Sequence, residues 1–288
     1  MQFPTGHNLP RPTRHDVASW AVKLGRFGLA ARGFVYIMVG LLAFRTAAGL
    51  GGMLTDKQGA VREIERLPFG HVVLWIVAFG LLGYVAWRFA QGFMDLDAYG
   101  HDAKAIRKRG AAIGSGLAHT GVATAALALA AGQPGWRIGG SGGDQSGDAA
   151  AQDWTAWLMS QPFGQWLVGI VGGIIAGVAI YQFYQAITCK FAKHLRGGGI
   201  SATQEKWSRR AGRIGYAARG IAFALVSWFL LNAAVHSNPS EAGGLSAAFR
   251  ALASQAYGGW MLGAVGLGFA LFGLYSIIEA RFRRIGGG

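Results

Sequence analysis

The sequence has 288 residues, of which 52% are hydrophobic and only 14% are charged, and its formal net charge is +14. A soluble domain carries nearer a quarter charged residues, so this composition excludes a soluble globular protein. The single cysteine excludes both an intramolecular disulfide and a metal site built on paired cysteines.

The apolar residues occur in six long runs. A helix that crosses the hydrocarbon core needs about 20 mainly apolar residues, and each run meets this length. In chain order the runs are residues 27–49, 70–93, 111–132, 164–188, 214–235 and 259–280. The sequence therefore predicts an all-α integral membrane protein, a bundle of six transmembrane helices.

The six runs are three tandem copies of one two-run unit. The even runs begin at equal spacing with the similar segments 67–70, 161–164 and 255–258, the first two of which read Pro-Phe-Gly. The first and fifth runs begin with closely similar segments, residues 25–33 and 212–220. Such internal repetition indicates one structural unit used three times.

These copies define the expected domain organisation. A tail of residues 1–23 precedes unit 1 at 24–100, unit 2 at 101–195 and unit 3 at 206–284. Each unit contains two spans, so all three units have the same orientation. Parallel repeats of this kind predict a pseudo-threefold axis along the membrane normal.

A short amphipathic segment lies between the two runs of each unit. Equivalent positions hold three aliphatic residues: Ile64, Leu158 and Leu252. The pattern predicts a short helix on the outer membrane face, and a solvated loop is the alternative. In unit 1 we expect Arg62, Glu63 and Arg66 to be exposed to water and Ile64 and Leu67 to be protected.

The positive charges divide unevenly between the two sets of loops. Most of the 27 Lys and Arg residues lie in the tail, in the loops after the second and fourth runs, and at the C-terminus. The positive-inside rule therefore predicts a protein of the bacterial inner (plasma) membrane with both termini in the cytoplasm. The basic clusters are expected to contact anionic lipids and not nucleic acid.

Two arginines lie about one and a half turns inside their runs, Arg32 in the first and Arg219 in the fifth. The equivalent position of the middle copy is Thr120. A charge within a span marks a functional site by default, whereas an arginine near a helix end can extend to the head groups. Substrate contact and structural pairing or snorkelling therefore both stay open.

One acid, Glu279, lies at a comparable depth, and Gln91 and Gln185 hold the equivalent positions of the other units. An unpaired carboxylate there would be costly, so we expect Glu279 to contact Arg219, Arg32 or both. A ring of such contacts near the inner face would be structural or would form one gate of a pore.

His119 is the histidine deepest within a run, while His71 and His236 lie at run ends. Paired histidines can ligate haem, but these are single residues without a zinc pattern. We therefore expect His119 to hydrogen-bond across helices, and we expect no metal and no cofactor.

Three glycines in the fourth run, Gly169, Gly173 and Gly177, recur at every fourth position. This seam of small residues favours close helix packing within the chain. The alternative is a contact in a homo-oligomer or with another membrane protein.

The repeated Gly-x-x-Ala-Arg-Gly entry, the Pro-Phe-Gly turn and the closing segment 275–284 resemble a bacterial membrane family, the domain of unknown function family 1206. Its members typically carry three copies of a two-helix unit. The likeness covers about residues 24–284, and it implies the architecture but no activity.

No nucleophile motif and no paired intramembrane carboxylates are present, so we expect no enzyme. Two hypotheses remain. The first is a non-catalytic scaffold or accessory subunit of a membrane assembly, which proline-free spans and few buried charges favour. The alternative is a small-solute transporter or channel with a path along the pseudo-threefold axis.

Overall fold

The computed structural model describes residues 14–51, 57–94, 102–133, 147–195 and 200–282. Part of the predicted tail, residues 1–13, lies outside this range. Long helices α1 (Arg14–Ala47), α3 (Gly70–Met94), α4 (Ala103–Ala130), α6 (Gly164–Thr188), α7 (Ala202–His236) and α9 (Gly258–Phe282) dominate the chain. Six helices are long and apolar enough to span a membrane, which confirms the predicted architecture.

Three of the long helices begin well before their apolar runs, and α4 begins at Ala103, ahead of the expected start at 111. α1 begins at Arg14 and α7 at Ala202, so each extends beyond the expected starts at 27 and 214. At α7 a capping box explains the start: the Ser201 hydroxyl accepts from the Gln204 backbone N–H, and the Gln204 side chain accepts in return. Hydropathy marks only the part of a helix that faces lipid, and polar turns can precede that part.

Short helices connect the two spans of each unit, as predicted: α2 (Lys57–Glu65), α5 (Gly147–Met159) and α8 (Leu245–Ala253). Two one-turn 3-10 helices, η1 (Lys190–His194) and η2 (Pro239–Glu241), complete the described elements. In α2, Ile64 is buried and Arg66 is exposed, as expected, while Arg62 and Glu63 are partly buried. The expectation for Leu67 was wrong: it is 43% exposed, because α2 ends at Glu65 and Leu67 lies in the following turn.

The turn into each returning span requires glycine. A Cβ atom on Gly70, Gly164 or Gly258 would lie 2.4, 2.3 or 2.0 Å from a backbone oxygen of the preceding short helix or its last turn. In the first two units the preceding Phe69 and Phe163 adopt positive φ angles of 60° and 61°. The repeated sequence motif is therefore a tight turn that joins the short helix to its span.

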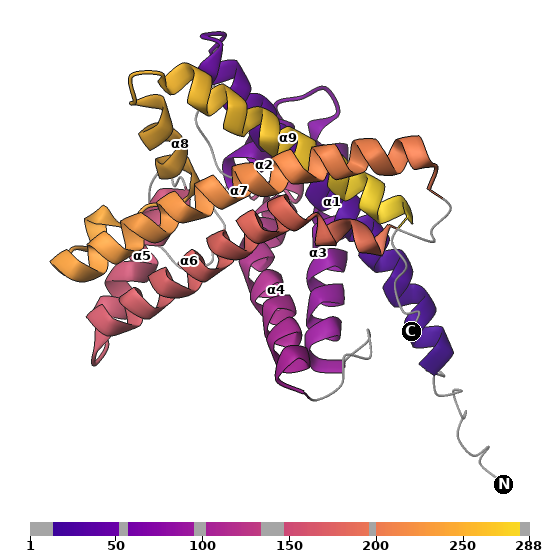
Figure 1. The fold of residues 1–288 in the computed structure, drawn as a ribbon, viewed down its shortest axis with the longest axis horizontal. Helices are drawn as coiled ribbons and strands as arrows, with labels where there is room; N and C mark the ends of the chain where they lie inside the picture. The colour runs from indigo at the N-terminus through magenta and orange to yellow at the C-terminus, as the bar shows by residue number, and fades with distance from the viewer. Residues whose placement is uncertain (1–13, 52–56, 95–101, 134–146, 196–199, 283–288) are drawn as a thin grey trace, which may run out of the picture.

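The spans pack in a ring that is open at one place. Extensive contacts join α1 to α9, α3 to α4 and α6 to α7, and these are contacts between units. Within units 1 and 3, α1 packs on α3 and α7 on α9. The equivalent pair of unit 2 differs: along their described residues, α4 and α6 make at most marginal contact, and they diverge in Figure 1.

The α1–α9 contact is the most extensive one between described helices. A Cβ on Gly273 would lie 2.4 Å from the Gly33 carbonyl oxygen, and a Cβ on Gly40 would lie 2.5 Å from that of Gly266. Glycines at these four positions let the two backbones touch, which van der Waals packing and interhelical contact favour in a membrane.

The glycine seam predicted in α6 does not pack inside the chain. Among the described residues, no neighbouring atom lies within 4 Å of a Cβ placed on Gly173 or Gly177, and Gly169 meets only the Ala234 methyl at 3.8 Å. Gly172 faces α7 instead, with Leu231 at 3.0 Å. One residue turns a helix by about 100°, so the seam points away from α7. The expectation of intrachain packing was wrong, and the alternative of an intermolecular contact stays a prediction.

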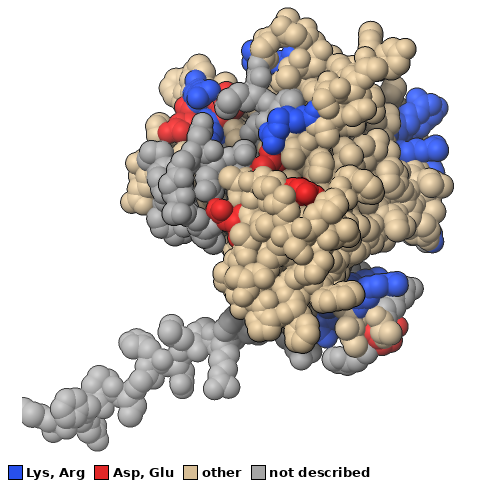
Figure 2. Space-filling model, turned by 90° about the vertical axis from the view of Figure 1, so that its left-hand side faces the viewer, with Lys and Arg blue, Asp and Glu red and all other residues tan. Residues whose placement is uncertain are grey.

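The surface is largely uncharged. Figure 2 shows a face on which charged side chains form small separate groups in a broad area of other residues. On α6, for example, Trp166, Ile174 and Ile180 are 74%, 62% and 69% exposed. A lipid environment accommodates such a surface, and water does not.

Gly273→Ala is expected to lower the thermal midpoint of unfolding in detergent, because the added methyl forces α1 and α9 apart. Overpacking of this kind costs about 1–3 kcal/mol. Gly173→Ala is the matched control, since its methyl meets nothing within 4 Å and alanine is the better helix former. A Gly273→Ala midpoint at or above that of the control would contradict the close α1–α9 contact.

Candidate functional site

Four cations from four helices lie in the centre of the bundle, and aromatic rings alternate with them. We call this series the cation–aromatic stack. Its members in spatial order are Lys57, Tyr36, Arg219, Phe272, Arg32, Tyr84, Arg88 and Trp87. Each cation faces at least one ring, and three rings are shared by two cations.

The distances are those of cation–π contacts. The Lys57 Nζ atom lies 4.8 Å and the Arg219 Cζ atom 5.3 Å from the centroid of the Tyr36 ring. Arg219 and Arg32 share Phe272 at 4.3 and 5.4 Å. A cation–π contact contributes about 0.5–1 kcal/mol at exposed sites and about 2 kcal/mol or more when desolvated.

Tyr84 joins the last two cations of the stack. Its ring centroid lies 5.0 Å from the Arg32 Cζ and 5.3 Å from that of Arg88. Its hydroxyl accepts from Arg32 Nη1 at 2.8 Å and from Arg88 Nε at 2.9 Å. One buried phenol therefore holds two guanidinium groups, and its hydroxyl also meets Ser115 Oγ of α4 at 3.0 Å.

Glu279 forms its predicted ion pair with Arg32. The Arg32 Nη2 atom lies 3.8 Å from Glu279 Oε2 and donates to Ser276 Oγ at 3.0 Å, and both charged residues are buried. Arg219 has a different partner, Gln182. When the Gln182 amide is oriented to match donors with acceptors, the amide oxygen accepts from Arg219 Nη2 at 2.9 Å. The two arginines therefore share a repeat position but have partners of different charge.

The partners follow the internal repeat. Equivalent positions on the odd spans are Arg32, Thr120 and Arg219, and those on the even spans are Arg88, Gln182 and Ser276. At the α9–α1 and α6–α7 interfaces the arginine comes from the odd span. Arg88 holds the even-span position of unit 1, and the partners described for it, Tyr84, Trp87 and Gln91, all lie in α3. Unit 2 lacks the arginine at Thr120, and Arg88 is linked to α4 through Tyr84, whose hydroxyl meets Ser115.

The expected ring of Gln91, Gln185 and Glu279 does not form as one ring. Gln91 accepts from Arg88 Nη1 at 3.1 Å, and so it binds an arginine as Glu279 does at the equivalent position. Gln185 instead donates to Tyr181 OH at 2.7 Å on the exposed side of α6. The contacts are pairwise because the divergence of α6 from α4 separates unit 2 from a closed ring.

His119 connects α4 to the first short helix. Its Nδ1 lies 2.8 Å from the Ser115 carbonyl oxygen, which can only accept, so Nδ1 carries the proton. The Nε2 atom is then the acceptor for the Lys57 ammonium at 3.4 Å. His119 lies 11 residues, or about 16 Å at the helical rise, inside the end of α4 at Ala130. Lys57 therefore reaches well inside the bundle.

The other two histidines lie at helix ends. His236 pairs with Glu241 at 2.7 Å where α7 ends, and His71 is exposed at the start of α3. Among the residues that the structure describes, no group of three or more His, Cys, Asp or Glu side chains could hold a metal ion.

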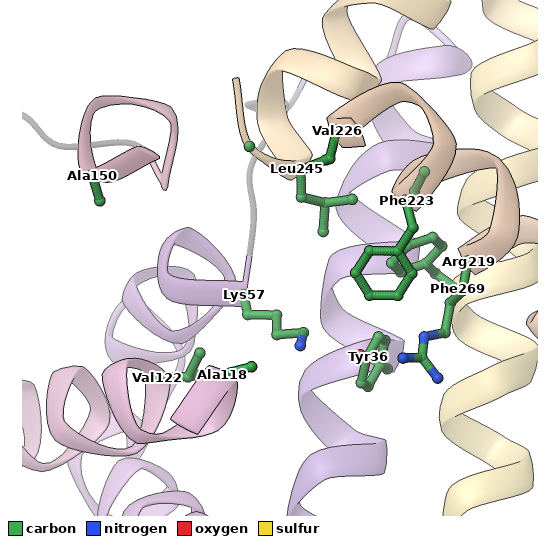
Figure 3. Close-up of a pocket in the computed structure, with 12 residues that line it drawn as sticks. Tyr36, Lys57, Ala118, Val122, Ala150, Arg219, Phe223, Val226, Leu245 and Phe269 are labelled. Carbon is green, nitrogen blue, oxygen red and sulfur yellow. The ribbon is translucent and has the colours of Figure 1, made fainter. Parts of the chain in front are cut away.

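A cavity of about 270 Å³ lies beside the Lys57 end of the stack. Tyr36, Lys57 and Arg219 supply its polar groups, and Figure 3 shows the two cations directed at Tyr36 from opposite sides. The remaining described lining is apolar and comes from α4, α5, α7, α9 and the start of α8. No carboxylate occurs among these described lining residues.

A buried carboxylate fixes the short helices at the edge of this cavity. Asp148 of α5 is 5% exposed, and its Oδ1 accepts from the backbone N–H groups of Gly244 and Ala247 at 2.8 and 3.0 Å. Its Oδ2 pairs with Arg250 of α8. Asp148 thus caps a helix of another unit, and because Gly244 and Ala150 line the cavity, this clasp fixes one wall.

The sequence did not single out Lys57, Tyr36, Arg88 or Asp148. Of these four, Arg88 could have been found from the sequence, because it is a charge in an apolar run and holds the repeat position of Gln182. Lys57 and Asp148 lie in connecting segments, where a charge is normal, and only the tertiary fold brings them to the cavity.

Comparison with known proteins agrees with the repeat structure. The model of a family described as Domain of Unknown Function (DUF1206) matches residues 27–95, 111–188 and 214–283. A protein of Bacillus subtilis (strain 168), named Uncharacterized protein YxxB, is similar to this chain with 31% identity over 272 residues, which cover 94% of each protein. No solved structure matches.

A double-mutant cycle tests the Glu279–Arg32 pair. Glu279→Gln and Arg32→Gln are each expected to lower stability in detergent, because breaking a buried pair costs about 3–5 kcal/mol. Together they should cost less than the sum, by about 0.5–3 kcal/mol. Glu279→Gln with Arg219→Gln is the control and should be additive, since Arg219 bonds Gln182. Additive costs in both cycles would disprove the pairing.

Asp148→Ala is expected to loosen α5 from α8, since it removes an ion pair and a helix cap, and loss of a cap alone costs about 0.5–2 kcal/mol. The measurement is the labelling rate of Leu245→Cys by a water-soluble thiol reagent, with Cys189 replaced by serine. The rate should rise in Asp148→Ala. It should stay the same in Glu63→Ala, which removes the exposed Glu63–Arg66 pair; equal rates in all three proteins would refute the clasp.

Proposed function

Because the chain belongs to the DUF1206 family, a family of unknown function, we propose a function from the geometry of its cavity. The protein is a non-enzymatic multi-pass membrane protein of the transporter or channel class. It binds a small anionic solute between α4 and α7.

One observation carries this proposal: Lys57 and Arg219 line a cavity whose described lining has no carboxylate. Their partners are neutral, namely the Tyr36 and Phe272 rings, His119 and Gln182. Charges removed from water need an opposite charge to offset the lost hydration. A bound anion supplies it, and the cavity is the space that such an anion can occupy.

The stack also suggests how an anion passes beyond the cavity. Below Tyr36 the centre is filled by Phe272, Tyr84 and the Arg32–Glu279 pair, all of them buried. A solute can proceed only if this part of the stack moves. Binding near the middle of the membrane, with a closed segment on one side, is the usual arrangement in proteins that work by alternating access.

The orientation follows from the basic residues. The start of α7 carries exposed Arg209, Arg210 and Arg213, and the Arg210 guanidinium lies over exposed Trp207 at 5.3 Å. Such basic and aromatic groups favour the anionic cytoplasmic surface of the inner membrane. We place both termini on that side, so the short helices face outward.

A scaffold or accessory role is the second candidate, and one feature favours it. The seam of Gly173 and Gly177 on α6 is open, and the neighbouring Ile170 and Ile174 are 58% and 62% exposed. Small residues beside large aliphatic ones suit contact with another helix. This role predicts that Gly173→Leu weakens an assembly while anion binding is retained.

Anion binding is tested with the purified protein in nanodiscs of neutral lipid. Phosphate, sulfate, nitrate and acetate are titrated separately, and the thermal midpoint is followed. At 100 times the dissociation constant a ligand stabilises by about 2.7 kcal/mol. At least one anion is expected to raise the midpoint saturably, and Lys57→Gln with Arg219→Gln should abolish the rise.

Arg66→Gln is the matched control, since it removes an exposed cation next to the end of α2 and should leave the rise unchanged. A response to none of the four anions, or an equal response in the double variant, would contradict the proposal.

A further inference from the structure

We infer that the anion is amphipathic, a single alkyl chain that ends in a carboxylate or phosphate, and that it enters from the bilayer between α4 and α6. This inference rests on the proposed anion site. It adds the class of ligand and its route, which follow from how the cavity is bounded.

The route follows from the open place in the ring. The two spans of a unit pack together in unit 1 (α1 on α3) and in unit 3 (α7 on α9). Along the described parts of α4 and α6 such packing is missing, and the described cavity lining includes residues of α4 and α7 but none of α6. The cavity thus lies behind the separated pair, where lipid chains would otherwise fill the space.

The distribution of polarity fits an amphiphile. Lys57 and Arg219 lie at the Tyr36 end, within 5.3 Å of one ring centroid. Away from that end the lining is aliphatic or aromatic, with Val122 on one side and Val226 and Leu245 on another (Figure 3). A charged head group suits the first end and a hydrocarbon chain the second, whereas an inorganic ion would leave the apolar walls unused.

Size and access limit the ligand further. At about 270 Å³ the cavity lies near the lower limit of small-molecule sites, about 300–1,000 Å³, so it takes one chain and not a two-chain lipid. On the side of the short helices, the Asp148 clasp to α8 bounds the cavity. The apolar route between two unpacked spans is therefore the route that suits an alkyl chain.

The test compares head group and chain separately in neutral nanodiscs. The probes are decanoate and decyl phosphate as amphipathic anions, acetate and phosphate as heads alone, and decyltrimethylammonium as the chain with a cationic head. For each, the concentration of half-maximal thermal stabilisation is measured in wild type and in Lys57→Gln with Arg219→Gln. The half-maximal concentration of a decyl anion is expected to be at least about tenfold lower than that of its head group alone. Burial of a few methylenes is enough to produce this difference.

The outcomes separate the two proposals. If acetate or phosphate binds as well as its decyl counterpart, the anion site stands and the amphiphile inference is wrong. If no anion acts through Lys57 and Arg219, both fail. If decanoate and decyltrimethylammonium act equally, the effect is a membrane effect, and the inference fails.

The placement of the alkyl chain beside α4 has its own variant pair. Ala118 lines the cavity on α4, and the adjacent Leu117 is 63% exposed and is not among the lining residues. Ala118→Phe is expected to raise the half-maximal concentration of decanoate at least about tenfold, because it fills the apolar space. Leu117→Phe should leave it unchanged, and equal effects of the two variants would overturn the placement of the alkyl chain in this cavity.

Discussion

Positive charge held inside the bundle, buried at Arg32 and partly buried at the other cations, with mostly neutral partners is the constraint on which this structure depends. Lys57, Arg219, Arg32 and Arg88 lie in the bundle, and among the residues that the structure describes one acid, Glu279, pairs with one of them, Arg32. Aromatic rings, amides and hydroxyls supply most of the remaining negative potential. Such partners satisfy a cation's geometry without cancelling its charge, and the bundle therefore keeps a positive potential at its centre.

The three-unit architecture determines where this potential lies. Each of the three sets of equivalent positions supplies one arginine to the stack, and the glycines of α1 and α9 bring the first and last units into backbone contact. Unit 2 breaks the symmetry twice, by Thr120 in place of arginine and by the separation of α4 from α6. The first change moves a cation to Arg88, and the second leaves space beside the remaining cations. The cavity is a consequence of this asymmetry and would close in a fully symmetric ring.

The sequence predicted the architecture because each span, turn and repeat is a local pattern. Runs of apolar residues and the Pro-Phe-Gly turns require no knowledge of neighbours. The pairing of Glu279 was predicted because an isolated acid in a span restricts its own partners. The cavity was not predicted, because it depends on the angle between α4 and α6 and on how far Lys57 reaches. Before the cavity was known, the small number of buried charges favoured a scaffold. The positions of those charges beside the cavity favour anion binding. The prediction that the glycine seam of α6 packs within the chain was wrong, because a shift of one residue decides which side of a helix packs.

A crystal structure in the presence of bromide tests the central claim most directly, because bromide is a monovalent anion that anomalous scattering locates without ambiguity. The account predicts an anomalous peak in the cavity, in contact with the Lys57 ammonium and the Arg219 guanidinium. A cavity without bromide, with a carboxylate of the chain itself bound to both cations, would contradict it.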